Sequence, residues 1–253
     1  MKDFYTNVAV DVDGYGSPKE LLVVGFNDEG RYQSRIPIKD CDLHIFKDDP
    51  TRSSEYRTID GRYVTKHNFA RWRDARQFVG ENQGISNSKL YGIHSKMSAK
   101  NLVDHYINYT WDKEVPYDFT KLTTAVVDIE VAADEGFPSV VDAEKPITAI
   151  AVKVKSQTIV YGCGDFTPKE TNHHYAKCTD EKHLLLKFLD DWEKLKVDII
   201  TGWNCELFDV PYIVNRMFNV LGEKEILRLS PWHIVEEGRL SKFAKVPGPG
   251  QFP

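Results

Sequence analysis

Long apolar runs are missing from this chain. No segment approaches the roughly 20 consecutive apolar residues that a membrane-spanning helix needs. The first residues, MKDFYTNVAVDVDGYG, lack the charged-then-apolar order of a secretory signal peptide. Cysteine is also scarce, with four among 253 residues and no Cys-x-x-Cys pair. These absences predict a cytoplasmic protein with reduced thiols and no membrane partner.

An excess of positive charge is missing as well. The 33 Lys and Arg residues are outnumbered by 38 Asp and Glu residues, so the formal net charge is −5. This balance differs from the strongly basic charge typical of proteins that bind duplex DNA. A local basic groove is nevertheless compatible with a net charge of −5. Nor do His173, His174, Cys178 and His183 have the paired spacing of a structural zinc site. We expect a solvated loop leading into a helix there.

What is present is ordinary globular composition, with 41% hydrophobic and 28% charged residues, which suits one large or two modest domains. Residues 1–110 read as a mixed α+β domain. Short strand-like runs are separated by turn residues, and NDEG after ELLVVGF predicts a hairpin. Apolar residues at helical spacing in HNFARWRDARQFVGENQG predict a helix. The polar stretch WDKEVPYDF then reads as a connector.

Residues 111–240 read as a second, α/β domain with a mixed sheet and helices packed on it. We expect strands near 122–131, 147–154, 157–163 and 197–204. We expect one helix near 181–196 with Asp180 as its N-cap, and a second that begins at Asp209 as N-cap, with Pro211 in its first turn. Residues 241–253 form a Pro/Gly-rich tail that we expect to be disordered.

Two carboxylates interrupt the apolar strand TTAVVDIEV. Strand side chains alternate between faces, so Asp128 and Glu130 share one face, with Cα atoms roughly 6.5 Å apart. Like charges so close repel each other, and a divalent cation removes that cost. Hard oxygen ligands at this spacing suit Mg²⁺ or Mn²⁺. The alternative is an amphipathic strand with a solvated polar face.

A second group of polar residues follows the later strand, in DIITGWNCELFDVPYIVNR. Asp209 stands at the strand-to-helix junction, where sites collect in α/β sheets. It could equally be a helix cap, and the two roles are compatible. Asn204 and Phe208 precede it; the alternatives to a functional role are a turn residue for Asn204 and a core residue for Phe208.

Together the two segments resemble a known family. Asp128-Ile129-Glu130 resembles the first exonuclease motif of family B DNA polymerases, and NCELFD, ending in Asp209, resembles the second, Asn-x-x-x-Phe/Tyr-Asp. The flanking YDFTKLTTAVVDIEVAADEGFP, KPITAI and ITGWNCELFDVPYIVNR are similar to the replicative polymerases of tailed bacteriophages. The resemblance is strong from about residue 115 to 232. Its specificity comes from finding both motifs in one chain, each in its expected strand context.

The resemblance implies a ribonuclease H-like 3′→5′ exonuclease domain over residues 111–240, preceded by a polymerase N-terminal domain. It implies two-metal phosphodiester hydrolysis with Mg²⁺ or Mn²⁺. The substrate would be a single-stranded DNA 3′ end or primer-template DNA, and the location would be the cytoplasm of a bacterial host if the protein is viral. Asp128 would bind both metals, Glu130 one, and Asp209 would be a further ligand. Phe137 would stack on the unpaired 3′ end, with a core role as its alternative, and Asn204 and Phe208 would also face DNA.

The sequence departs from the family in two respects. The family's third motif, Tyr-x-x-x-Asp, has no counterpart here, because Tyr212 is followed by Arg216 and Asp209 is the last Asp. The polymerase signatures Ser-Leu-Tyr-Pro-Ser and Asp-Thr-Asp are absent as well. We therefore expect an incomplete site, little or no activity of the chain alone, and the remainder of a polymerase as partner. A non-catalytic binding module with a ribonuclease H-like shell and a stand-alone nuclease are the alternatives.

Overall fold

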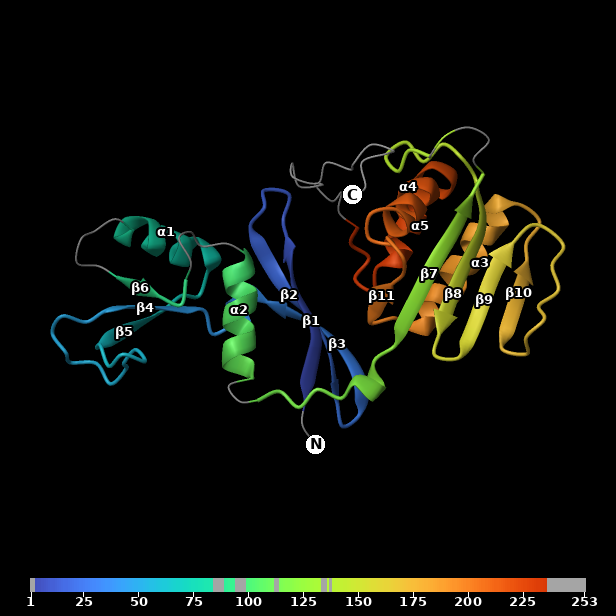
Figure 1. The fold of residues 1–253 in the computed structure, drawn as a ribbon. Coiled ribbons are helices and arrows are strands. Elements are labelled where there is room, and N and C mark those ends of the chain that lie inside the picture. Colours follow the sequence, from blue (N-terminus) through green and yellow to red (C-terminus); the bar gives the residue numbers. More distant parts are fainter. Residues whose placement is uncertain are drawn as a thin grey trace, which may run out of the picture. The chain divides into compact units, whose positions relative to one another are not determined.

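The structure is a computed structural model, and it describes residues 3–83, 89–93, 99–111, 114–132, 136 and 138–235. The chain divides into two compact units, residues 1–121 and residues 122–253. Each has its own hydrophobic core, and each is described by itself below. Figure 1 labels the helices and strands.

The first unit begins with an antiparallel three-stranded sheet. Its strands are β1 (Phe4–Val12), β2 (Pro18–Asn27) and β3 (Gly30–Pro37), in the order β1-β2-β3. Asn27 pairs with Gly30, so the hairpin predicted at NDEG is confirmed. Val23 and its neighbours in β2 are buried, because this central strand is covered by side chains on both faces.

The rest of the first unit combines a second small sheet with two helices. The sheet order is β5-β4-β6, built from β4 (His44–Asp48), β5 (Val64–Asn68) and β6 (Leu90–Tyr91). The helices are α1 (Trp72–Asn82), close to the helix predicted from its apolar spacing, and α2 (Ala99–Thr110). Both helices contribute to one core with the first sheet, through Trp72, Ala75, Val79 and Leu102.

The second unit is built on a five-stranded mixed sheet in the order β10-β9-β8-β7-β11. Its strands are β7 (Thr124–Val131), β8 (Ile147–Val154), β9 (Gln157–Gly162), β10 (His173–Lys177) and β11 (Ile199–Thr201). Antiparallel pairing joins β7, β8 and β9, whereas β10 runs parallel to β9 and β11 runs parallel to β7. The predicted mixed α/β architecture of this region is therefore confirmed.

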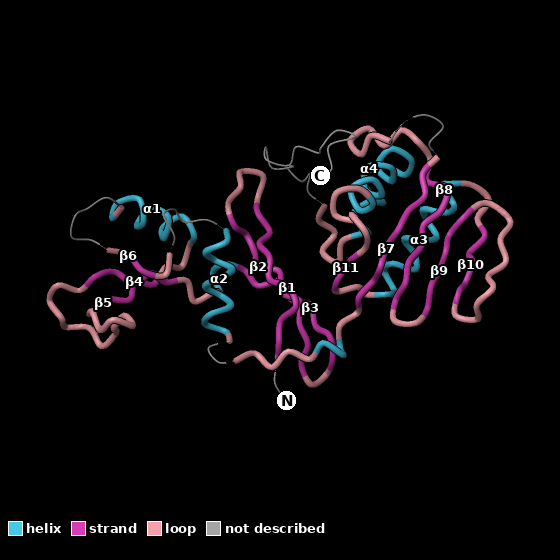
Figure 2. The backbone as a smooth tube through the Cα atoms, in the orientation of Figure 1, coloured by secondary structure: helices cyan, strands magenta, loops and turns pink. Residues whose placement is uncertain are grey.

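Two helices cover one face of this sheet, as Figures 1 and 2 show. They are α3 (Glu181–Leu195) and α4 (Asp209–Leu221), followed by the short α5 (Glu223–Ile226). Their apolar stripes meet the strands in a single core, which includes Ile150, Leu185 and Met217. Asp180 caps α3 as predicted, because its side chain accepts a hydrogen bond from the amide of His183.

Three local expectations are wrong. Residues 173–177 form strand β10 and not a solvated loop, because their backbone completes the sheet beside β9. The predicted strand at 197–204 shrinks to the three residues of β11, since the chain then turns away from the sheet. The N-cap of α4 is Phe208, and Asp209 is the first helical residue.

Within the part of the chain that the structure describes, no helix is both long and apolar enough to cross a membrane. All four cysteines are free thiols.

Candidate functional site

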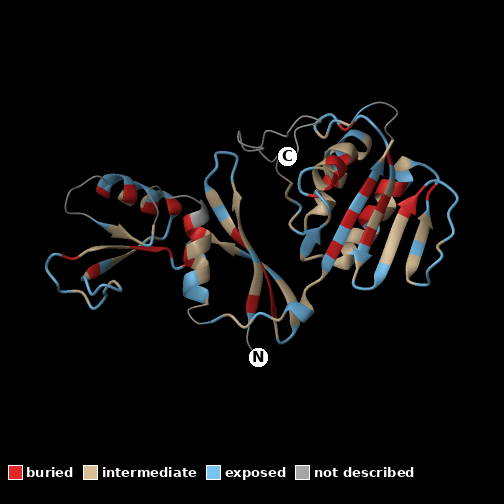
Figure 3. Cartoon of the chain, viewed as in Figure 1, coloured by how far each residue is buried: buried red, intermediate tan, exposed pale blue. Residues whose placement is uncertain are grey.

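Strand β7 carries the two carboxylates on the face opposite the core. Ala125, Val127 and Ile129 are buried, whereas Asp128 and Glu130 are exposed. Figure 3 shows this alternation along β7 as successive bands. The alternation follows from the twofold repeat of a strand covered by helices on one side.

Asp209 reaches β7 from the first turn of α4. Its side chain is only 4% exposed, and its Oδ1 accepts a hydrogen bond from the backbone amide of Ile129 at 3.0 Å. This amide has no strand partner, because β11 pairs with β7 only as far as Thr201 opposite Val126. Asp209 therefore takes the place of a strand in the ladder and does not cap its own helix.

Asp209 lies within electrostatic reach of both exposed carboxylates. Burial raises the pKa of Asp209 above its usual value, and the negative charges of Asp128 and Glu130 raise it further. Yet among the described residues no three His, Cys, Asp or Glu side chains stand close enough to hold one metal ion. The structure thus places the three acids around one strand segment without gathering them into a ready-made cluster.

The connection between β11 and α4 is shaped by a close approach at Gly202. A Cβ atom at this position would lie 2.4 Å from the carbonyl oxygen of Val127 and 3.0 Å from the Cβ of Cys205. Only glycine lets the chain turn so near to β7. The carbonyl of Asn204 then accepts hydrogen bonds from the amides of Leu207 and Phe208, each at 3.0 Å. This tight turn delivers Asp209 to the amide of Ile129.

Comparison with known proteins decides what these two segments belong to. Residues 70–245, more than half of the chain, match the family described as DNA polymerase family B, exonuclease domain. The chain belongs to this family. The resemblance drawn from Asp128-Ile129-Glu130 and the segment ending in Asp209 is therefore confirmed.

Relatives in this family include two phage enzymes. The chain is 31% identical over 209 residues to the DNA-directed DNA polymerase of Escherichia phage RB69. This alignment covers 72% of the chain and 22% of the phage protein. It is 30% identical over 261 aligned positions to the DNA-directed DNA polymerase of Enterobacteria phage T4, and this alignment covers 91% of the chain and 27% of the phage protein. The DNA polymerase delta catalytic subunit of Caenorhabditis elegans is 32% identical over 149 residues, and this alignment covers 54% of the chain and 13% of the nematode protein. The chain spans about a quarter of the phage relatives' length.

The three residues expected to face DNA have different surroundings in this family B domain. Asn204 is exposed and has a left-handed backbone, with a φ of 55°. Phe208 is half-buried and packs against the core, with its ring centroid 5.4 Å from that of Tyr212. Phe137 lies outside the described residues. The turn and core alternatives for Asn204 and Phe208 therefore have structural support, and a DNA role for any of the three stays a prediction.

One exposed aromatic residue near the site was not singled out from the sequence. Trp203 is 93% exposed, between Gly202 and Asn204 in the turn that leads to Asp209. Single exposed apolar side chains are common on protein surfaces, so the exposure of Trp203 matters because of its place in the turn that precedes Asp209. Its neighbour Leu207 is also exposed. The signal available from the sequence was the composition of GWN alone, which does not distinguish a core tryptophan from an exposed one.

The departure at Tyr212 and Arg216 has a structural explanation. The hydroxyl of Tyr212 donates to the carbonyl of Lys145 at 2.8 Å. Arg216 makes a two-pronged ion pair with Glu181, at 2.8 and 2.7 Å, and also donates to the carbonyl of Ala143. This face of α4 therefore anchors the segment that connects β7 to β8. Neither side chain faces the carboxylates as a catalytic group.

Proposed function

We propose that this chain supplies the first two carboxylate motifs of a 3′→5′ proofreading exonuclease with a ribonuclease H-like fold. The substrate is the single-stranded 3′ end of DNA, presented at a primer terminus. The observation that carries the proposal is the hydrogen bond from the amide of Ile129 to Asp209. It joins the two motifs at the main-chain group that lies between Asp128 and Glu130.

The donor set fits a divalent cation by its chemistry. All three side chains offer carboxylate oxygens, which are the ligands that Mg²⁺ and Mn²⁺ prefer. Burial is the main cause of the raised pKa of Asp209, and the charges of Asp128 and Glu130 add to it, so a cation bound near the three carboxylates would offset part of this cost. In our proposal Asp128, Glu130 and Asp209 hold the ions, which when bound activate water and stabilise the leaving 3′ oxygen.

The chain's own contribution is positioning. The amide of Ile129 fixes one oxygen of Asp209, so that rotation of this carboxylate is restricted before any ligand arrives. The exposed face of β7 presents Asp128 and Glu130 on a strand held by β8 along its length. Sites built on strands and helix ends hold their geometry better than sites on loops.

The remaining parts of such a site are proposed to come from the remainder of a polymerase. A two-metal nuclease needs a further carboxylate and a group that orients the water. Tyr212 and Arg216, which occupy the spacing of the third motif, are engaged with the backbone and with Glu181. We therefore expect the 253-residue chain, tested alone, to be inactive or weakly active.

The test is trimming of 3′-labelled single-stranded DNA in Mg²⁺ or Mn²⁺. The wild-type chain should trim weakly or not at all, and adding a polymerase segment that carries a Tyr-x-x-x-Asp helix should raise the rate. Asp128→Asn should abolish that gain, whereas Asp165→Asn, which removes an exposed charge elsewhere in the second unit, should not. Robust trimming by the chain alone would overturn the incomplete site. Restored trimming in Asp128→Asn would overturn the assignment of the site.

A non-catalytic DNA-binding module is the second candidate. The observation that favours it is the exposed Trp203 beside a carboxylate group that is not gathered for a metal in the described part of the chain. Such a module would bind single-stranded DNA equally well in chelator and in Mg²⁺. It would also remain without activity when the third-motif segment is added.

A further inference from the structure

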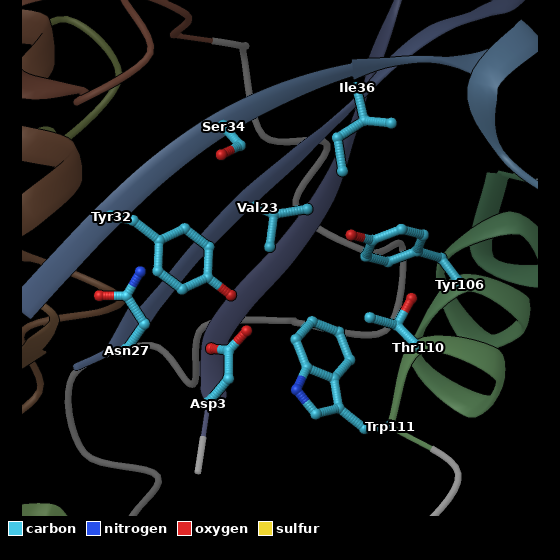
Figure 4. Close-up of a pocket in the computed structure, with 9 residues that line it drawn as sticks. All are labelled: Asp3, Val23, Asn27, Tyr32, Ser34, Ile36, Tyr106, Thr110 and Trp111. Atoms are coloured by element: carbon cyan, nitrogen blue, oxygen red, sulfur yellow. The ribbon is translucent and has the colours of Figure 1, made fainter. Parts of the chain in front are cut away.

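A hollow in the first unit is unrelated to the carboxylates of β7. It lies between the face of the β1-β2-β3 sheet and the end of α2, and has a volume of about 300 Å³. Figure 4 shows the residues that line it, with the rings of Tyr32, Tyr106 and Trp111 around the space and the carboxylate of Asp3 at its edge. This volume is at the lower end of the range for small-ligand sites.

The charge of this hollow has one sign. Among the described residues that line it, Asp3 is the one with a charged side chain. The hydroxyl of Tyr32 is hydrogen-bonded to Asp3, and burial together with this negative charge raises the pKa of Tyr32 well above its usual value. Burial raises the pKa of Tyr106 as well. Both tyrosines therefore remain neutral at physiological pH, so Asp3 supplies the charge among the described residues that line the hollow.

The aromatic walls are held in place by their own packing. The ring centroid of Trp111 lies 4.8 Å from that of Tyr5 and 5.8 Å from that of Tyr106. Tyr32, Tyr106 and Trp111 also pack against the core of the first unit. Because neighbouring groups already order these rings, a ligand would lose little affinity to arranging them.

The hollow offers hydrogen-bond acceptors as well as ring faces. Asp3 contributes carboxylate oxygens and Ser34 a hydroxyl, whereas the amide oxygen of Asn27 already accepts a hydrogen bond from the backbone amide of Glu29 at 2.9 Å. A phosphate or carboxylate ligand would be repelled by Asp3, and a single carboxylate is too few ligands for a dedicated calcium or magnesium site. The chemistry that matches is a flat cation with several N–H donors.

We propose that this hollow binds an alkylguanidinium group, stacked on the aromatic walls and paired with Asp3. A guanidinium is planar and weakly hydrated, so it stacks on rings and satisfies several acceptors at once. An alkylammonium shares the charge but is strongly hydrated and cannot stack. The group comes either from a free small guanidine or from an arginine side chain in a peptide.

The direct test is calorimetric titration of the full chain with three probes that share one stem: butylguanidine, butylamine and butylurea. Butylguanidine should bind most tightly, butylamine more weakly, and the neutral butylurea weakest of all. Asp3→Asn should weaken butylguanidine binding about 10-fold or more, because it removes a charge-assisted hydrogen bond. Glu55→Gln, which removes an exposed acid elsewhere in the first unit, should leave binding unchanged.

Two further arms complete the test. Trp111→Leu should weaken binding, whereas Trp111→Phe should retain part of it; if Trp111→Leu does not fold, the comparison of Asp3→Asn with Glu55→Gln decides. A capped Gly-Arg-Gly peptide that binds more tightly than butylguanidine would indicate an arginine of a protein as the natural ligand, and the reverse order a free guanidine. Equal binding of butylurea and butylguanidine, or no effect of Asp3→Asn, would overturn the proposal.

Discussion

Asp209 accepts a hydrogen bond from the backbone amide of Ile129, which lies 80 residues earlier in the chain and between two exposed carboxylates. The bond is buried, and it replaces a strand-to-strand contact where β11 has ended. The hydrogen bond thereby fixes the side chain of a helix residue relative to the backbone of strand β7. This makes the placement of Asp209 independent of the rotamers of Asp128 and Glu130.

This relationship separates a structural from an electrostatic role for Asp209. Asp209→Asn keeps an oxygen acceptor and removes the charge, so we expect it to leave the free energy of unfolding unchanged or slightly higher, because the raised pKa marks an unfavourable charge. Asp209→Ala leaves the buried amide of Ile129 without a partner and should cost about 1–3 kcal/mol. Urea unfolding measures both. Equal losses of stability in the two variants would contradict the account. Both variants should also reduce Mn²⁺ binding, measured by calorimetry.

Gly202 should tolerate no side chain. Gly202→Ala would place a Cβ against the backbone oxygen of Val127, which cannot move without shifting β7, and we expect a loss of about 1–3 kcal/mol. Gly80→Ala is the matched control. Gly80 lies in α1, where an added Cβ would meet nothing within 4 Å, so alanine should stabilise that helix by about 0.5–1 kcal/mol. Urea unfolding of both variants tests this, and no loss in Gly202→Ala would show that the close approach is relieved.

The first unit should lose stability in mild acid. His44 and His105 are buried, and each donates a ring N–H to the carbonyl of Asp42, at 2.8 and 2.6 Å. Burial lowers the pKa of both rings, and the neighbouring His105 lowers that of His44 further. Because the unfolded chain protonates first, near pH 6.5, stability is full above that pH and falls as the pH drops toward the folded pKa values.

The measurement is the free energy of unfolding at pH 7.5 and pH 5.5. Each histidine should contribute at most about 1.4 kcal/mol to the loss, the equivalent of one pH unit below its unfolded pKa. His105→Gln keeps an N–H donor for Asp42 but does not titrate, so it should lose less stability over the same interval. An identical pH dependence in the wild type and in His105→Gln would rule out this histidine as the cause.

Trp203 should contribute to binding of single-stranded DNA. Its ring is almost fully exposed beside the proposed site, and stacking of one base on an aromatic ring is worth about 1–3 kcal/mol. Trp203→Ala should weaken binding of a fluorescent oligonucleotide, measured by anisotropy in chelator, without lowering the thermal midpoint. Phe218→Ala removes another exposed ring, on α4, and should leave binding unaltered. Equal effects of the two variants would indicate non-specific binding.

Much of the second unit follows from local pattern. The alternation in TTAVVDIEV is sufficient to place Asp128 and Glu130 away from the core, because one face of a strand must meet the helices. The apolar stripe and the capping residue Asp180 locate α3 almost to the residue. The two motifs, taken with their spacing, also indicated the family that the comparisons establish.

Only the tertiary structure decided what Asp209 does. Its position at a strand-to-helix junction suggested a helix cap, and nothing local distinguishes a carboxylate that bonds to its own helix from one that bonds to a distant strand. The difference arises because β11 ends at Thr201 and leaves the amide of Ile129 unpaired, and a buried N–H must find an acceptor. The same reasoning holds for Tyr212, whose hydroxyl is occupied by the carbonyl of Lys145, 67 residues earlier. Periodicity determines the elements, whereas partners so far apart in the chain are determined by how the sheet is ordered.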